Sequence, residues 1–212
     1  MDEITFNPNN LSRQVESDEE YEAILKDLKE KLLLKYSSKQ MLGYSGRQPF
    51  IPKNLENILE PVRKAFGGIK NVAGKRILDL GCGGSLSYDF PKRLFEPWFC
   101  RALQELGANV VGVDNRPLND KEEFEHYNLD LSKPEALSIF PDESFDGVNL
   151  NSFFDSPDLI HQSFDPSKTH QINEKDMKNW IGAQIKRLLK KDAKFVHLVD
   201  SDRQDIKKDL GL

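Results

Sequence analysis

RILDLGCGGS, residues 76–85, is a short apolar run that leads directly into a cluster of glycines. The run has the length and composition of a strand buried on both faces, and glycine lets the following backbone turn sharply and approach a ligand closely. In an open parallel sheet, ligands bind beyond the carboxyl ends of the strands. The stretch therefore predicts a strand and turn with a candidate ligand site, although tight strand–helix turns also use glycine without any ligand.

From residue 75 onward the chain alternates short apolar runs with helical patterns. We expect five strands, over residues 76–80, 109–113, 124–129, 145–150 and 194–199. Apolar residues at helical spacing predict one helix that begins near Pro97 and another over 174–190. Strands that alternate with helices are typical of a parallel sheet, which places this part of the chain in the α/β class.

The chain before residue 71 is predicted to be a helical lead-in. Ser17 and Glu20 have the spacing of a capping box, and the apolar pattern that follows predicts a helix to about Tyr36. A second helical pattern begins at Leu55 and stops at Gly67. We therefore expect three parts, which are a flexible arm over 1–16, the lead-in over 17–70 and a ligand-binding domain over 71–212.

Two further strands are expected to end near acidic residues. Asp114 follows the strand over 109–113, and Asp130 follows the strand over 124–129. A carboxylate at a second strand end can accept hydrogen bonds from both hydroxyls of a ribose. An acid at the third strand end can meet the exocyclic amine of adenine. The alternative for Asp130 is that it only caps the loop that it begins.

With these residues the chain resembles the class I S-adenosylmethionine-dependent methyltransferases over roughly residues 70–200. The resemblance implies a Rossmann-like, doubly wound, mostly parallel sheet with helices on both faces. It also implies S-adenosylmethionine as cofactor, with the glycine turn beside its amino-acid part, the second acid at the ribose and the third by adenine. Asn151, in the family's fourth-strand segment, is expected to line the methyl-transfer pocket. The residues expected to contact the cofactor are Asp79, Gly81, Cys82, Gly83, Asp114, Asn115, Asp130, Leu131 and Asn151.

Three features depart from the family pattern. Ser85 stands where the motif has its third glycine. Asp79 and Asp114 are 35 positions apart, and the surplus, Leu86–Trp98, is either a lid or a surface insertion. Few residues follow Val199, so we expect the family's C-terminal strand hairpin to be missing. The fifth strand is then an edge that the tail covers or that pairs with a second copy of the chain in a homodimer.

Composition excludes several classes of protein. The 212 residues are 38% hydrophobic and 31% charged, which excludes collagen-like and wholly disordered chains. Two cysteines are too few for a disulfide framework, and they form no metal-ligand spacing with histidine. We find no targeting segment and no apolar run long enough for a membrane span. We therefore expect a cytoplasmic protein with reduced thiols, no metal and no membrane association.

The net charge of −5 is unevenly distributed along the chain. Residues 1–25 carry a balance of −6, residues 26–76 carry +8 and residues 77–212 carry −7. The overall balance argues against a dedicated nucleic-acid binder. The basic stretch predicts a solvated helix face, and the alternative is a docking surface for an anionic substrate or RNA.

The resemblance implies transfer of a methyl group to an acceptor, which we expect to be a small molecule, with RNA or protein as alternatives. The sulfonium of the cofactor is an activated leaving group, so the protein chiefly has to align donor and acceptor, and no particular catalytic residue follows. A second possibility is a non-catalytic, methyltransferase-like binding or regulatory module. Nicotinamide dinucleotide binding is disfavoured because Leu86 stands where that fingerprint has its third glycine.

Overall fold

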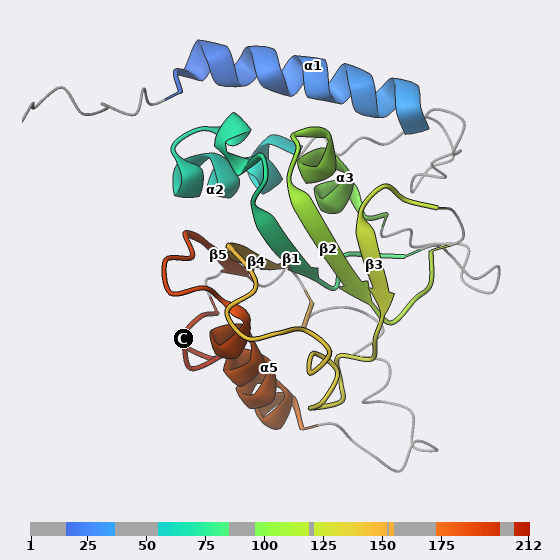
Figure 1. Cartoon of the computed structure of the whole chain (residues 1–212), viewed down its shortest axis with the longest axis vertical. Helices are drawn as coiled ribbons and strands as arrows, with labels where there is room; N and C mark the ends of the chain where they lie inside the picture. Colours follow the sequence, from blue (N-terminus) through green and yellow to red (C-terminus); the bar gives the residue numbers. More distant parts are fainter. Residues whose placement is uncertain are drawn as a thin grey trace, which may run out of the picture.

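The computed structural model describes residues 16–36, 55–84, 96–118, 121–151, 153–154, 173–199 and 206–212. Five strands form one sheet in the order β3-β2-β1-β4-β5, and all neighbouring strands are parallel. They are β1 (Arg76–Leu80), β2 (Asn109–Asp114), β3 (Glu125–Asn128), β4 (Gly147–Asn151) and β5 (Phe195–Val199). The predicted Rossmann-like α/β fold is confirmed (Figure 1).

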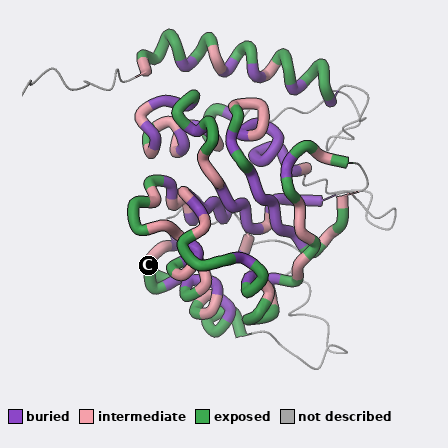
Figure 2. Tube along the Cα trace, viewed as in Figure 1, coloured by how far each residue is buried: buried purple, intermediate pink, exposed green. Residues whose placement is uncertain are grey.

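Helices cover both faces of this sheet. α2 (Leu55–Phe66) and α3 (Trp98–Glu105) pack on one face, and α5 (Glu174–Leu188) packs on the other. α1 (Asp18–Tyr36) lies over α2 and α3 as an outer layer, and the short helix η1 (Ile69–Val72) leads into β1 (Figure 1). Because both faces are covered, the central strands are buried along most of their length (Figure 2). None of these helices is long and apolar enough to cross a membrane.

Three strands are shorter than the sequence predicts, and for β5 the difference is one residue, since it begins at Phe195 instead of residue 194. β4 begins at Gly147 instead of residue 145, because Phe145 forms only an isolated bridge. The carboxylate of Asp146 accepts a hydrogen bond from the backbone nitrogen of Arg76 at 2.8 Å, so a side chain takes a place that the strand ladder would otherwise fill. β3 ends at Asn128 because its neighbour β2 ends directly opposite.

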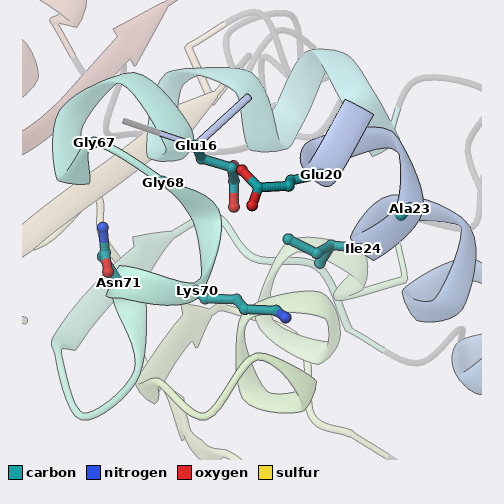
Figure 3. A pocket seen from close by; sticks show the side chains of 8 residues that line it. All are labelled: Glu16, Glu20, Ala23, Ile24, Gly67, Gly68, Lys70 and Asn71. Atoms are coloured by element: carbon teal, nitrogen blue, oxygen red, sulfur yellow. The ribbon is translucent and has the colours of Figure 1, made fainter. Parts of the chain in front are cut away.

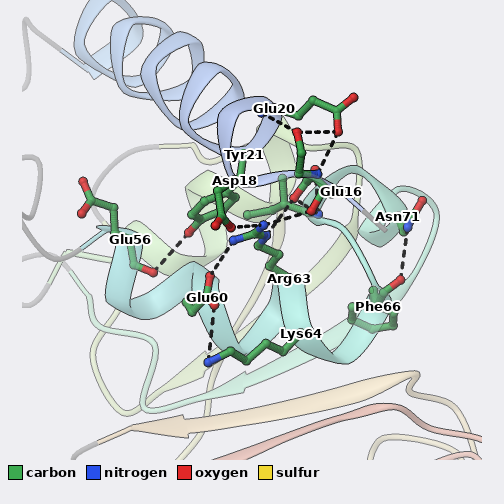
Figure 4. Close-up of polar contacts among 12 residues, drawn as sticks. Glu16, Asp18, Glu20, Tyr21, Glu56, Glu60, Arg63, Lys64, Phe66 and Asn71 are labelled. Atoms are coloured by element: carbon green, nitrogen blue, oxygen red, sulfur yellow. Dashed lines mark hydrogen bonds and ion pairs between the residues drawn. The ribbon is translucent and has the colours of Figure 1, made fainter. Parts of the chain in front are cut away.

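The start of α1 is fixed by the predicted capping box. The Oγ atom of Ser17 accepts a hydrogen bond from the backbone nitrogen of Glu20 at 3.2 Å, and the Glu20 carboxylate accepts one from the Ser17 nitrogen at 2.9 Å. Arg63 of α2 pairs with Asp18 at 2.7 Å, and its guanidinium carbon lies 4.5 Å from the ring centre of Tyr21 (Figure 4). These contacts join the start of α1 to α2.

The end of α1 is held by a buried arginine of α3. Arg101 is 2% exposed, and its guanidinium carbon lies 4.3 Å from the ring centre of Tyr36 and 4.8 Å from that of Trp98. Its Nη2 atom pairs with Glu96 and Glu122, each at 2.7 Å. The apolar side chains of α1 belong to the same hydrophobic cluster as those of β1 and β2. The predicted boundary between the lead-in and the ligand-binding domain stays a prediction.

The last residues of the chain cover part of β5. The backbone nitrogen of Ile206 donates to the carbonyl oxygen of Leu198 at 3.0 Å, and the side chains of Ile206 and Leu210 are buried. Leu210 rests on α5 at Gly182, where a Cβ atom would lie only 1.8 Å from the Leu210 carbonyl oxygen. The C-terminal residues thus contact the edge strand β5, and coverage of this strand by the tail is one of the two arrangements that the sequence predicts. Pairing of this edge with a second copy stays a prediction.

We expect Gly182→Ala to lower the free energy of unfolding by about 1–3 kcal/mol, because the added Cβ overlaps the backbone of Leu210. At an unobstructed helix position the same change would stabilise the protein by about 1 kcal/mol. Urea denaturation measures the difference. In a chain that ends at Lys208, the substitution should become neutral or stabilising, and an equal loss there would contradict the contact.

Candidate functional site

The carboxyl ends of all five strands lie at one edge of the sheet because the strands are parallel. β1 lies at the centre, and the chain passes from it to β2 and β3 on one side before it returns to β4 and β5 on the other. The strand order therefore reverses between β1 and β4. This is the place at which open α/β sheets bind ligands.

The glycine turn after β1 is fastened to β2 by backbone hydrogen bonds. The nitrogens of Gly81 and Cys82 donate to the carbonyl oxygen of Val113 at 2.8 and 3.1 Å. Gly81 has a φ of 74° and Gly83 a φ of 95°. A residue with a Cβ atom rarely adopts such angles, so the turn requires glycine at both positions.

Two side chains of the protein lie against this turn. A Cβ atom on Gly81 would be 2.8 Å from Cδ2 of Phe153, and one on Gly84 would be 2.7 Å from Cβ of Arg116. These glycines are therefore also needed for close packing within the protein. A ligand that binds on the turn has to lie beside Phe153 and Arg116 or displace them.

Asp114, at the end of β2, is hydrogen-bonded directly to the glycine turn. Its side chain is 7% exposed, and its Oδ2 atom accepts a hydrogen bond from the backbone nitrogen of Gly83 at 2.9 Å. Its Oδ1 atom accepts from the backbone nitrogen and Nε of Arg116, at 3.0 and 3.2 Å. Asn115 follows and is exposed. Two parts of the predicted site, the turn and the second acid, thus lie together.

Asp79 lies on β1, two residues before the turn, and is 3% exposed. Its Oδ1 atom accepts a hydrogen bond from Nδ2 of Asn149 at 2.7 Å, and its Oδ2 atom accepts one from Sγ of Cys100 at 3.2 Å. Burial raises the pKa of Asp79 to about 6, against the lowering effect of these two hydrogen bonds, and the charge of Asp114 adds to the rise. Asp79 therefore titrates closer to neutral pH than an ordinary carboxyl group does.

Cys82 and Cys100 are buried thiols that share the space above Gly112 of β2. Burial raises the pKa of Cys100 well above its usual value. The pKa of Cys82 is also raised, because burial and the nearby acids outweigh the lowering effect of its hydrogen bond with Cys100. Cys82 is therefore a neutral packing side chain at ordinary pH. Among the described residues, no group of three or more acidic, cysteine or histidine side chains could hold a metal ion.

Asp130 and Leu131 lie beyond β3 at the same edge of the sheet. The Asp130 carboxylate accepts hydrogen bonds from the backbone nitrogen and Oγ of Ser132, at 3.0 and 2.5 Å. These bonds cap the turn, which is the alternative that the sequence left open for Asp130, and the residue is exposed. The side chain of Leu131 instead packs in the core on the α5 side, and its carbonyl oxygen accepts a hydrogen bond from Nε1 of Trp180 at 3.3 Å.

The exit of β4 brings one amide and two aromatic side chains to this edge. Asn151 is the last residue of β4 and is exposed. Phe153 and Phe154 follow, with ring centroids 5.2 Å apart in an edge-to-face arrangement. Since Phe153 also lies against Gly81, the predicted fourth-strand segment and the glycine turn are neighbours. The predicted insertion, Leu86–Trp98, lies mostly outside the described residues.

Sequence analysis did not assign Asn149, His197 or Arg116 to the site. Asn149 lies opposite Asp79 in the β1–β4 register and opposite His197 in the β4–β5 register. The sequence contained a signal for Asn149 and His197, because each of these two residues interrupts an apolar strand pattern. The pairing register that aligns them cannot be read from the chain, and no pattern indicates Arg116.

A pocket of about 350 Å³ lies elsewhere, between the start of α1 and the turn from α2 to η1 (Figure 3). Glu16, Glu20 and Lys70 are among the residues that line it. Its two carboxylates already have partners, since Glu16 accepts a hydrogen bond from the backbone of Ile69 at 3.1 Å and Glu20 accepts from Ser17. The pocket is near the amino end of β1, which η1 precedes, and is therefore distinct from the strand-end site.

The basic stretch over residues 26–76 is largely paired with acids. Six of its nine described Lys and Arg side chains form ion pairs. The pairs are Lys29–Glu56, Lys31–Asp27, Lys35–Glu105, Arg63–Asp18, Lys64–Glu60 and Arg76–Glu125. Three of these acids, Asp18, Glu105 and Glu125, lie outside the stretch and neutralise part of its positive balance, which weakens the case for an RNA-docking surface.

Comparison with known proteins adds no relative to this description. No family model and no curated protein matches the chain. Its function therefore has to be argued from the strand-end site.

The buried carboxyl of Asp79 should give the stability of the protein a measurable pH dependence. Because folding raises the pKa of Asp79 from 3.8 to about 6, its favourable contribution is present below pH 4 and is lost as the pH rises through 6. Asp79→Asn removes this loss. The stability of the variant relative to the parent should therefore increase between pH 4 and 7, by on the order of 2–3 kcal/mol.

Urea denaturation of both proteins at several pH values between 4 and 7.5 measures this change. Groups other than Asp79 cancel in the difference between the two profiles. Parallel profiles would show that Asp79 titrates alike in the folded and unfolded states.

Proposed function

We propose that the chain is an S-adenosylmethionine-dependent methyltransferase that acts on a small molecule in the cytoplasm. The observation that carries the proposal is the hydrogen bond from the Gly83 nitrogen to Asp114 at 2.9 Å. It joins the glycine turn after β1 to the acid after β2, at the edge where the strand order reverses. This arrangement supports the binding of a nucleoside whose ribose hydroxyls donate to Asp114.

The residues at this edge have the donor and acceptor types that an adenosyl ligand needs. A carboxylate oxygen can accept two hydrogen bonds, and Oδ2 of Asp114 accepts one from Gly83 among the described residues. It can therefore also accept a ribose hydroxyl. The buried charge of Asp79 favours the amino-acid end of the cofactor, which carries an ammonium group, and the exposed Asp130 can accept from an exocyclic amine.

S-adenosylmethionine, when bound, supplies a methyl group on a sulfonium that is already a good leaving group. The chain has to align an acceptor with this group and keep water away. Phe153 provides partly exposed apolar surface at the exit of β4, with the buried Phe154 behind it, and the amide of Asn151 can orient an acceptor. We assign no catalytic base, because an acceptor with an available lone pair reacts without one.

A binding or regulatory module without turnover is the second candidate. The observation that favours it is the packing of Phe153 against Gly81 and of Arg116 against Gly84 and Asp114. These side chains occupy part of the surface on which the cofactor would lie. Accumulation of S-adenosylhomocysteine with a panel of small-molecule acceptors distinguishes the candidates, because a module binds the cofactor without consuming it.

Titration calorimetry should detect binding of S-adenosylmethionine and of S-adenosylhomocysteine. Asp114→Ala should weaken this binding by about 1–3 kcal/mol, because it removes the ribose acceptor and releases the Gly83 nitrogen. Asp192→Ala makes the same charge change at an exposed position in the turn between α5 and β5. This control should leave the affinity unchanged.

The outcomes of this experiment are distinct. A folded protein that binds neither ligand removes the proposal. Unchanged affinity in Asp114→Ala would mean that the ribose lies elsewhere. Binding of a nicotinamide dinucleotide in their place would favour the competing interpretation of the glycine turn.

A further inference from the structure

Three polar side chains form a row across the buried face of the sheet that α2 and α3 cover. Asp79 of β1, Asn149 of β4 and His197 of β5 lie opposite one another in the strand register. Nδ2 of Asn149 is 2.7 Å from the Asp79 carboxylate, and Oδ1 of Asn149 is 2.8 Å from Nδ1 of His197. The row is thus hydrogen-bonded without a break from β5 to the strand that carries the glycine turn.

The chemistry of these groups sets the direction of both hydrogen bonds. An ionised carboxylate only accepts, so the Asn149 amide has to donate to Asp79 through its nitrogen. The amide oxygen of Asn149 then faces His197 and can only accept. His197 therefore carries a hydrogen on Nδ1 and donates it to Asn149, which fixes the orientation of the amide.

This row lies among apolar side chains and has a cost in desolvation. Ile77 precedes Asp79 on the same face of β1, and Phe195 precedes His197 on the same face of β5. Apolar residues at such positions would pack without that cost, since a buried ionisable network is often no more stable than a hydrophobic one. Asp79 lies two residues before Gly81, and this position favours a role for the row at the ligand site.

The other titratable groups that face Asp79 do not neutralise its charge. Cys100 of α3 donates its thiol hydrogen to Asp79, and Cys82 is a second neutral thiol nearby. Asp114 of β2 is an acid and already pairs with Arg116. No Lys or Arg pairs with Asp79 in the part of the chain that the structure describes, so a ligand with a positive group would compensate its charge.

We propose that Asn149 and His197 are positioning residues that hold Asp79 as an oriented anion behind the glycine turn, where it selects adenosyl ligands that carry a positive group. The inference rests on the proposed function and goes beyond it, because it assigns ligand selection to a hydrogen bond between β4 and β5. His197 acts on the ligand site through Asn149, and Asn149 acts through Asp79.

The test uses two ligands that differ in the relevant group. S-adenosylhomocysteine carries an amino-acid part with an ammonium and a carboxylate group, whereas 5′-methylthioadenosine has the same adenosine and thioether but lacks this whole part. His197→Leu and Asn149→Leu should each weaken S-adenosylhomocysteine binding about tenfold at pH 7, because Asp79 loses its oriented donor. Binding of 5′-methylthioadenosine should change less than about twofold, because its contacts do not include Asp79.

His197→Asn is the matched control, because its amide nitrogen can donate to Asn149 as Nδ1 of histidine does. It should keep the preference for S-adenosylhomocysteine. His197→Phe preserves the ring stacking on Phe195, where the centroids are 6.1 Å apart, and replaces His197→Leu if that variant does not fold. Melting temperatures of all variants confirm that the folded proteins are compared.

A pH series separates positioning from a merely structural role. In the parent, affinity for S-adenosylhomocysteine should rise as Asp79 ionises around pH 6, and in His197→Leu this rise should move to higher pH because the carboxylate has lost support. Equal weakening of both ligands, or no weakening of either, overturns the inference while the proposed function stands. If the folded parent binds neither ligand, the proposed function fails, and the inference fails with it.

Discussion

Parallel pairing of all five strands is the constraint on which the rest of this structure depends. It brings the carboxyl ends of all five strands to one edge of the sheet, so that residues far apart in sequence meet there. It also requires each connection to return along a face of the sheet to the amino ends of the strands, as α3 does between β1 and β2 and α5 does between β4 and β5 on the opposite face. The glycine turn after β1 and Asp114 after β2 are neighbours for this reason, and the hydrogen bond from Gly83 then fixes their distance.

Two buried acids at this edge are stabilised in different ways, and this difference supports the different roles that we propose for them. Asp114 accepts three hydrogen bonds, including one from the guanidinium of Arg116, so its charge is compensated within the protein. Asp79 has only neutral donors, Asn149 and Cys100, in a less accessible position. Desolvation therefore outweighs hydrogen bonding at Asp79 and raises its pKa. In the function that we propose, Asp114 holds the neutral ribose hydroxyls and Asp79 attracts a positively charged group.

The ion pairs of α1 show that part of the positive charge of residues 26–76 is neutralised when the chain folds. The sequence from residue 26 to 76 has a strong positive balance, yet Lys35 pairs with Glu105 and Glu123, which belong to later parts of the chain. Arg101 is held between Tyr36 and acids from two loops in the same region. α1 is thus held by ion pairs with later parts of the chain as well as by its buried apolar side chains.

The sequence predicted correctly the features that depend only on residues close together in the chain. The apolar run over 76–80 and the capping box at Ser17 each depend on neighbours in the chain, and both were found where predicted. Asp114 could be placed beside the turn because strand order in such sheets follows a rule. The end of β3 was misplaced, because it depends on the length of the strand that pairs with it.

The sequence by itself determined the class of fold, the strand positions to within about two residues, and the edge at which polar residues gather. Only the tertiary structure decided that Phe153 and Arg116 pack on the glycines and that Asp79, Asn149 and His197 form one row. The physical reason is that periodicity within a strand is a property of one segment. Register between strands and the packing of side chains on a turn are properties of segments that meet only on folding.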